Sequence, residues 1–224
     1  MDPRSKNGPG TDRHASLAEE FRTQEACLRT GVPAVRVGIV PETALSYGIG
    51  VAATARYLDR ARAEGVAVVR RSTGGSGLLH LRGDLYWAVV LPREDPRVGR
   101  DFVRAFDRLG EGTVRGLGSV GVRAEWGPAP ALAEAYCPLS SRGRVLCAAG
   151  RILGGAAQHA TATALLHHGS LSWRVDRAMV DRLFELEADG PSRHLAGVSE
   201  LSPARTAQDV ARALEAANRA HFRL

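Results

Sequence analysis

Two stretches of the sequence, far apart along the chain, hold most of the residues that could do chemistry. Residues 70–80 read RRSTGGSGLLH, and residues 137–170 begin with a cysteine and end in HHGS. Paired arginines before a glycine-rich turn suit recognition of a carboxylate or phosphate, because a guanidinium forms bidentate, charge-assisted hydrogen bonds. The Gly154-Gly155 pair lets a backbone approach a ligand closely, since glycine has no Cβ. We predict that the two stretches form the walls of one pocket.

Cys137 is the sharpest candidate for a nucleophile. A cysteine acts as a nucleophile when its thiol has a lowered pKa or a base lies nearby. His80, His167 or His168 could supply that base. The alternative is a buried thiol that only packs, and the residues alone leave both interpretations open. Cys147 lies in a strand-like run and is expected to belong to the core.

The histidine pair and Gln158 each allow two interpretations. His167 and His168 either contact a ligand or fix a strand through side-chain hydrogen bonds. Neighbouring side chains on a strand point to opposite faces, so we do not expect the pair to bind a metal ion. Gln158 fits a polar contact in the pocket as well as an ordinary turn.

Hydrophobic periodicity places the elements that must position these residues. Ser16 is predicted to cap the first helix and Gly31 to end it. A strand at residues 66–69, expected to be fully buried, delivers the two arginines to the glycine turn. The pattern predicts helices at residues 17–28, 58–63, 102–109, 176–187 and 204–222, the last beginning at Ser202 or Pro203, and strands at residues 35–40, 44–47, 66–69, 85–91, 122–126, 145–149 and 151–153.

Residues 116–121 match the glycine pattern GxGxxG of dinucleotide-binding proteins. The functional pattern lies between a strand and the first turn of a helix. Here it follows a predicted helix and leads into a predicted strand. The sequence therefore argues against a Rossmann domain.

Composition limits the class of protein. The chain has 224 residues, 44% of them hydrophobic, which suits one domain over residues 15–224 after a disordered tail at residues 1–14. We find no apolar run that could span a bilayer and no secretory signal, so we expect a cytoplasmic protein without membrane contact. The three cysteines are expected to be free thiols, because their spacing fits neither a disulfide framework nor a zinc site.

The net charge of +6 rests almost entirely on arginine, since Lys6 is the only lysine in the chain. A basic surface favours an acidic partner, either nucleic acid or an acidic carrier domain. Nucleic acid is the less favoured of the two, because no basic run is interleaved with aromatic residues and no helix-turn-helix pattern stands out.

Residues 70–84 and 150–170 resemble the biotin/lipoate A/B protein ligase family, in particular its lipoate-protein ligase and octanoyltransferase branch. That family carries an RRxSGGGAVxHDxGN-like stretch, followed later by a GRKxxGSAQ-like stretch that ends in HHGT or QHGS. The resemblance implies an α+β fold with a mixed central β-sheet flanked by helices. It also implies a binding site for a small acyl ligand formed by Arg70, Arg71, Thr73, Gly74, Gly75, Ser76, His80, Ile152, Gly154, Gly155, Gln158, His167, His168 and Gly169.

The same resemblance gives two site residues a particular meaning. Cys137 stands where cysteine-dependent octanoyltransferases of this family carry their nucleophile, at the same spacing before the GRKxxGSAQ-like stretch. Ile152 stands where the family has its central lysine. The implied function is transfer of an octanoyl- or lipoyl-type group to a lysine of an acceptor lipoyl domain through a Cys137 thioester, without a cofactor.

Two other functions stay open at this point. One is an ATP- and Mg-dependent lipoate-type ligase that works through an acyl adenylate. The other is a non-catalytic binding or regulatory module that keeps the pocket but not the reaction. The partners that the resemblance implies are an acidic carrier or acceptor protein, namely a lipoyl domain, the glycine-cleavage H protein or an acyl carrier protein.

Overall fold

The computed structural model describes residues 16–99, 101–140, 144–188 and 190–224, so the predicted tail at residues 1–14 lies outside the described part of the chain. Its elements in chain order are α1 (Leu17–Thr30), β1 (Ala34–Ile39), β2 (Ala44–Tyr47), α2 (Arg56–Ala63), β3 (Ala67–Arg70), β4 (Gly77–His80), β5 (Leu85–Pro92), α3 (Phe102–Ser119), β6 (Glu125–Pro128), η1 (Cys137–Leu139), β7 (Arg144–Ala148), β8 (Arg151–Ala160), β9 (Ala164–Leu171), α4 (Arg177–Phe184), η2 (Pro191–His194), α5 (Val198–Leu201) and α6 (Ala207–Phe222).

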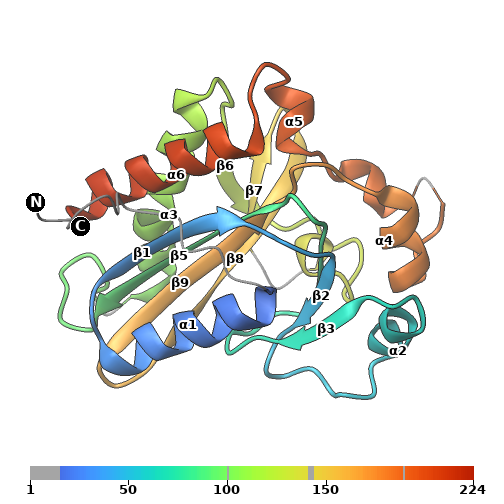
Figure 1. Cartoon of the computed structure of the whole chain (residues 1–224), viewed down its shortest axis with the longest axis horizontal. Coiled ribbons are helices and arrows are strands. Elements are labelled where there is room, and N and C mark those ends of the chain that lie inside the picture. Colours follow the sequence, from blue (N-terminus) through green and yellow to red (C-terminus); the bar gives the residue numbers. More distant parts are fainter. Residues whose placement is uncertain (1–15, 100, 141–143, 189) are drawn as a thin grey trace, which may run out of the picture.

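Two sheets form the centre of the molecule (Figure 1). The larger has six antiparallel strands in the order β1-β5-β9-β8-β7-β6. The smaller has the order β3-β2-β4, with β2 parallel to β3 and antiparallel to β4. The α+β fold with helices flanking a β-sheet is confirmed, and its mixed character lies in the small sheet.

Alternation along β5 shows how the layers are arranged. Leu85, Trp87 and Val89 join the largest apolar cluster, which includes Leu109 of α3 and Leu214 of α6. Successive strand residues point to opposite faces, so the residues between them must face the other side. There Tyr86 packs with α1, as do Ala88 and Val90. Helices α3 and α6 therefore cover one face of the large sheet, and α1 lies on the other.

Helix α1 begins and ends as predicted. The Ser16 hydroxyl accepts a hydrogen bond from the Glu19 amide, and Gly31 ends the helix in the left-handed conformation. Its buried face combines the apolar residues Leu17, Phe21 and Leu28 with two polar ones, Glu20 and Gln24. Buried polar side chains need hydrogen-bond partners, which places a polar network under this helix.

Helix α3 is longer than predicted and contains the GxGxxG stretch up to Ser119. The predicted end at residue 109 is wrong because the glycines that follow do not break the helix but give it room to pack. A Cβ on Gly112 would come within 2.5 Å of Asn218 Oδ1, and one on Gly116 within 2.9 Å of Leu214 Cα. Gly116, the first glycine of the pattern, and Gly112 before it thus serve helix packing against α6, and the argument against a Rossmann domain stands.

Three smaller expectations also change. Strand β8 continues through the glycine pair to Ala160, so Gln158 lies in a strand rather than a turn. Strand β3 is partly exposed rather than fully buried, because it forms the edge of the small sheet. Helix α6 begins at Ala207 instead of at Ser202 or Pro203, and Thr206 and Asp209 form the capping box at this start.

Within the described residues, no helix combines the length and apolar character needed to cross a membrane.

The packing of α3 on α6 predicts opposite effects for two glycines that lie two positions apart. We expect Gly116→Val to lower the free energy of unfolding by about 2 kcal/mol or more, because its side chain would press on the backbone of α6. Gly118 is exposed and has no atom near its missing Cβ, so Gly118→Ala should stabilise the helix by about 0.5–1 kcal/mol. Chemical denaturation measures both, and unchanged stability in Gly116→Val would contradict the close contact.

Candidate active site

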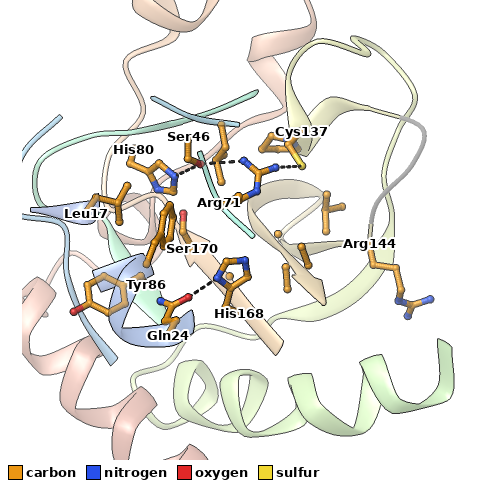
Figure 2. A pocket seen from close by; sticks show the side chains of 18 residues that line it. Leu17, Gln24, Ser46, Arg71, His80, Tyr86, Cys137, Arg144, His168 and Ser170 are labelled. Carbon is orange, nitrogen blue, oxygen red and sulfur yellow. Dashed lines mark hydrogen bonds between the residues drawn. The ribbon is translucent and has the colours of Figure 1, made fainter. Parts of the chain in front are cut away.

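A cavity lies between the large sheet, the small sheet and α1, and the empty space in it and in the open solvent at its mouth amounts to about 610 Å³. Its wall is mostly apolar. Figure 2 shows Cys137 and Leu17 on opposite sides of it. Leu17 is fully buried, whereas Cys137 is partly exposed. The cavity therefore runs from a thiol within reach of solvent to an apolar interior. It is lined by Leu17, Phe21, Gln24, Ser46, Arg71, Leu78, His80, Tyr86, Cys137, Pro138, Arg144, Val145, Gly155, Ala156, Ala157, His168, Gly169 and Ser170.

Arg71 fixes the glycine turn beside Cys137. Its guanidinium donates hydrogen bonds of 2.9 Å each to the carbonyls of Gly74 and Ser76, and its Nη2 lies 4.0 Å from the Cys137 Sγ. Gly75 has a φ of 92°, and a Cβ there would come within 2.9 Å of Sγ. Glycine is needed at this position because of its positive φ and because a Cβ would also come within 2.7 Å of the Arg71 Nη2.

His168 joins the two predicted walls. Its Nε2 lies 2.8 Å from the Thr73 hydroxyl, and its Nδ1 lies 2.6 Å from the Gln24 Oε1. The Gln24 amide nitrogen donates to Glu20, so its oxygen faces the histidine. His168 Nδ1 must then carry the proton, and Nε2 accepts from Thr73. Burial, together with the charge of Arg71, lowers the pKa of His168 to about 3, so the ring is neutral.

His80 belongs to a second buried network. Its Nε2 lies 2.8 Å from the Ser46 hydroxyl, which also accepts a 3.0 Å hydrogen bond from Arg71. Burial lowers the pKa of His80 to about 3, with a further contribution from the charge of Arg71. The Nδ1 of His80 is buried without a hydrogen-bond partner in the described residues. Arg71 therefore links the thiol to a neutral histidine on the cavity wall.

The structure brings most of the predicted site residues together. Those that line the cavity are Arg71, His80, Cys137, Gly155, His168 and Gly169. Thr73, Gly74, Gly75 and Ser76 form the turn against them. The two stretches do form walls of one pocket.

Five predicted site residues do not line the cavity, namely Arg70, Ile152, Gly154, Gln158 and His167. Arg70 is exposed and donates to the Ile49 carbonyl, because it and Arg71 leave the strand in opposite directions. Ile152 is only 5% exposed and packs in the apolar cluster behind Cys137. Gly154 packs against the backbone of Ser170 on β9.

His167 and Gln158 lie on the face of the sheet that α3 covers. The His167 ring packs edge-on against the Phe106 ring, with 4.9 Å between the ring centroids. The Gln158 amide nitrogen lies 3.3 Å from the His167 Nδ1. His167 is therefore separated from Cys137 by the sheet, as expected for neighbours on a strand. Burial lowers the pKa of His167 to about 3.

Sequence reasoning missed the wall formed by α1. Glu20 and Gln24 lie at core-facing positions of this amphipathic helix, which is the signal that could have revealed them. Glu20 accepts hydrogen bonds from Arg36, Gln24 and Tyr86, so the network behind His168 ends in an ion pair between buried Glu20 and partly exposed Arg36.

The model of the lipoyl protein ligase A/B catalytic domain matches residues 18–219. The chain belongs to this family. The predicted resemblance is therefore confirmed, and it extends from α1 to the last turns of α6.

Curated relatives of this chain are octanoyltransferases LipM. The protein of Exiguobacterium sp. is 32% identical over 156 residues, which cover 64% of this chain and 55% of the relative. That of Macrococcus caseolyticus is 30% identical over 139 residues, 58% of this chain and 49% of the relative. That of Carboxydothermus hydrogenoformans is 28% identical over 179 residues, 75% and 62% respectively. The chain thus spans roughly half to three-fifths of the length of these relatives.

Solved structures show the same fold. Lipoate-protein ligase A bound with ATP superposes with a TM-score of 0.73 at 22% identity, covering 91% of this chain and 79% of the other. A putative lipoate protein ligase from T. acidophilum with bound lipoic acid gives a TM-score of 0.72 at 22% identity, covering 91% and 80%. These likenesses establish the architecture around the cavity.

The neutral buried histidines predict acid sensitivity. Their folded pKa values, about 3, lie below the ordinary value of about 6.5, so this stability is fully present above pH 6.5 and is lost as the pH falls toward 3. Each contributes a slope of up to about 1.4 kcal/mol per pH unit. We expect His168→Gln to reduce the slope of unfolding free energy against pH by one such increment between pH 6 and 4.5. Thr73→Val breaks the same hydrogen bond but should keep the slope, whereas an unchanged slope in His168→Gln would contradict burial of a neutral ring.

The buried position of Ile152 predicts a cost for a lysine there. Its side chain packs with Tyr136, Leu139 and Leu195, so an ammonium there would be buried without a partner. We expect Ile152→Lys to destabilise the protein by about 3 kcal/mol and Ile152→Met by less than about 1.5 kcal/mol. Thermal unfolding compares the two. Equal stability would mean that side chains at this position can reach solvent or the cavity.

Proposed function

We propose that the protein is an enzyme that transfers an octanoyl- or lipoyl-type acyl group from a carrier thioester to a lysine of an acceptor lipoyl domain, with Cys137 as the nucleophile. The observation that carries the proposal is a partly exposed thiol at one end of a mostly apolar cavity. Membership of the lipoyl protein ligase A/B family and similarity to octanoyltransferases support it.

The cavity suits an acyl chain. Beyond the thiol, its wall is formed by Val145, by Ala156 and Ala157 of β8, and by Leu17 and Phe21 of α1. The polar atoms of His168 on that wall are already paired with Thr73 and Gln24. A saturated chain therefore gains apolar contacts and displaces no hydrogen bond of these groups.

The reaction would proceed in two steps. The Cys137 thiol loses its proton to solvent, and the thiolate attacks the carbonyl carbon of the donor thioester. The new C–S bond forms as the old one breaks, and the donor leaves as a thiolate that takes a proton from solvent. A lysine amine of the acceptor then attacks the Cys137 thioester. The C–N bond forms, Cys137 leaves as a thiolate, and the surplus proton of the amine goes to solvent.

Charge and similarity support a protein partner. The chain has a net charge of +6, which favours an acidic carrier domain. An archaeal lipoylation system of the same fold was solved as a bipartite lipoate protein ligase together with its E2 lipoyl domain, with a TM-score of 0.70 at 20% identity. We propose acidic acyl carrier and lipoyl domains as donor and acceptor.

The proposed reaction needs no nucleotide. A thioester already carries an activated acyl group, so the first step forms one thioester at the expense of another. ATP and Mg²⁺ would be required only if free acid were the substrate. A transfer assay can separate the thioester-dependent reaction from the ATP-dependent one. One sample receives octanoyl carrier protein without ATP, and the other receives octanoic acid with ATP and Mg²⁺.

The direct test is an acyl adduct on Cys137. We expect the purified protein, mixed with octanoyl carrier protein and no ATP, to gain the mass of one octanoyl group, located on Cys137 by peptide mass spectrometry. Hydroxylamine should remove it, as it does a thioester. Cys137→Ala should lose transfer to a lipoyl domain by about a thousandfold or more.

The chain offers matched controls. Cys147 is partly buried on β7, and Cys27 lies on α1 outside the cavity lining, so Cys147→Ala and Cys27→Ala should keep most of the activity. Transfer that persists in Cys137→Ala, or modification only with octanoic acid and ATP, would overturn the proposal.

A further inference from the structure

The Arg71 guanidinium is a buried charge without a carboxylate partner. Its residue is only 4% exposed. Its hydrogen bonds go to the Gly74 and Ser76 carbonyls and to the Ser46 hydroxyl, all of them neutral groups. Among the residues that the structure describes, no carboxylate forms an ion pair with it. An isolated buried charge is costly, so a counter-ion is expected close by.

Burial lowers the pKa of Arg71, and two nearby ionisable groups act in the opposite direction. These groups are the Cys137 thiol and the Tyr57 phenol. Tyr57 does not become an anion at neutral pH, because burial raises the pKa of its hydroxyl above the ordinary value. Cys137 remains, with its Sγ 4.0 Å from the Arg71 Nη2. Geometry and chemistry together leave the thiol as the group that can supply the missing negative charge.

The other arginine on the cavity wall does not compete for this role. Arg144 pairs with Asp107 at 2.7 Å and lies over the Phe106 ring. Figure 2 shows its guanidinium pointing away from Cys137. Because the chain has a single lysine, Lys6, nearly every positive side chain that could serve here is an arginine.

We propose that Arg71 is the counter-ion of the Cys137 thiolate and, after acylation, the positive charge beside the thioester carbonyl. Arginine stays protonated, so it stabilises charge and takes no proton. The thiol proton therefore leaves to solvent before attack, and no base on the cavity wall is needed. The inference rests on the proposed role of Cys137 in acyl transfer.

The hydrogen bonds of Arg71 make the charge a fixed one. Gly75 has no side chain that would collide with the guanidinium and the thiol, and the Arg71 Nη1 donates to the Ser46 hydroxyl. Preorganised charge stabilises an anion that develops beside it without any reorganisation. The same bonds also hold the turn, so the test must separate charge from structure.

Alkylation of Cys137 makes that separation. Iodoacetamide is neutral and iodoacetate is an anion, and both react with the thiolate. We expect Arg71→Met to slow alkylation of Cys137 by iodoacetamide at pH 7 by about tenfold or more. It should slow iodoacetate further, so that the ratio of the iodoacetate rate to the iodoacetamide rate falls. Arg71→Lys should keep much of the ratio, because it keeps a charge.

Arg70→Met is the matched control, since Arg70 is the exposed neighbour on the other side of the strand. It should leave both rates unchanged. Peptide mapping assigns the modification to Cys137, and circular dichroism confirms that each variant is folded. A folded Arg71→Met protein with unchanged rates would overturn the inference.

The unmodified protein provides an independent readout if Arg71→Met does not fold. The iodoacetate to iodoacetamide ratio at Cys137 should exceed that of N-acetylcysteine amide, a neutral model thiol. An equal ratio would overturn the charge pairing. The acyl-adduct test is separate: a charge-dependent ratio without an octanoyl adduct would defeat the proposed function, and an adduct with an unchanged ratio would defeat the role of Arg71.

Discussion

The cavity depends on the hydrogen bond between the Thr73 hydroxyl and His168. It joins two segments about a hundred residues apart, the glycine turn of the small sheet and the central strand β9. Behind it, Gln24 and Glu20 continue the chain of hydrogen bonds to the partly exposed guanidinium of Arg36. The polar atoms of His168 and Gln24 that face the cavity are thereby paired, which leaves an apolar lining where an acyl group can lie.

This network also restricts the chemistry of the site. Histidines often act as bases near neutral pH, but here burial holds His80 and His168 neutral with pKa values of about 3. His167 lies across the sheet beneath α3. The charge next to the thiol is instead that of Arg71. The site therefore favours stabilisation of an anion over proton abstraction by a neighbouring side chain.

Much of the fold could be predicted from the sequence because it rests on local patterns. The caps of α1 at Ser16 and Gly31 and the buried strand at β5 follow from signals within a few residues. The length of α3 could not be predicted, since two of its glycines, Gly112 and Gly116, are explained only by their contacts with α6. Local propensity marks Gly112 and Gly116 as breaks, and tertiary contact makes them necessary.

The site residues show the same contrast between what local patterns predict and what distant contacts decide. That Arg70 and Arg71, or His167 and His168, would point apart follows from the strand period, but which member faces the cavity depends on the register of distant strands. Gln24 escaped notice because its partner His168 lies far along the chain. Ile152 was expected near the ligand by alignment, yet β8 turns its side chain into the core behind Cys137.

The central claim is that an acyl group on Cys137 occupies the cavity beneath α1. A crystal structure of the protein labelled with octyl methanethiosulfonate, which places an eight-carbon chain on Cys137, tests it most directly. The octyl chain should run past Ala156 and His168 toward Leu17 and Phe21. A chain that lies on the surface, with the cavity closed by side chains, would contradict it.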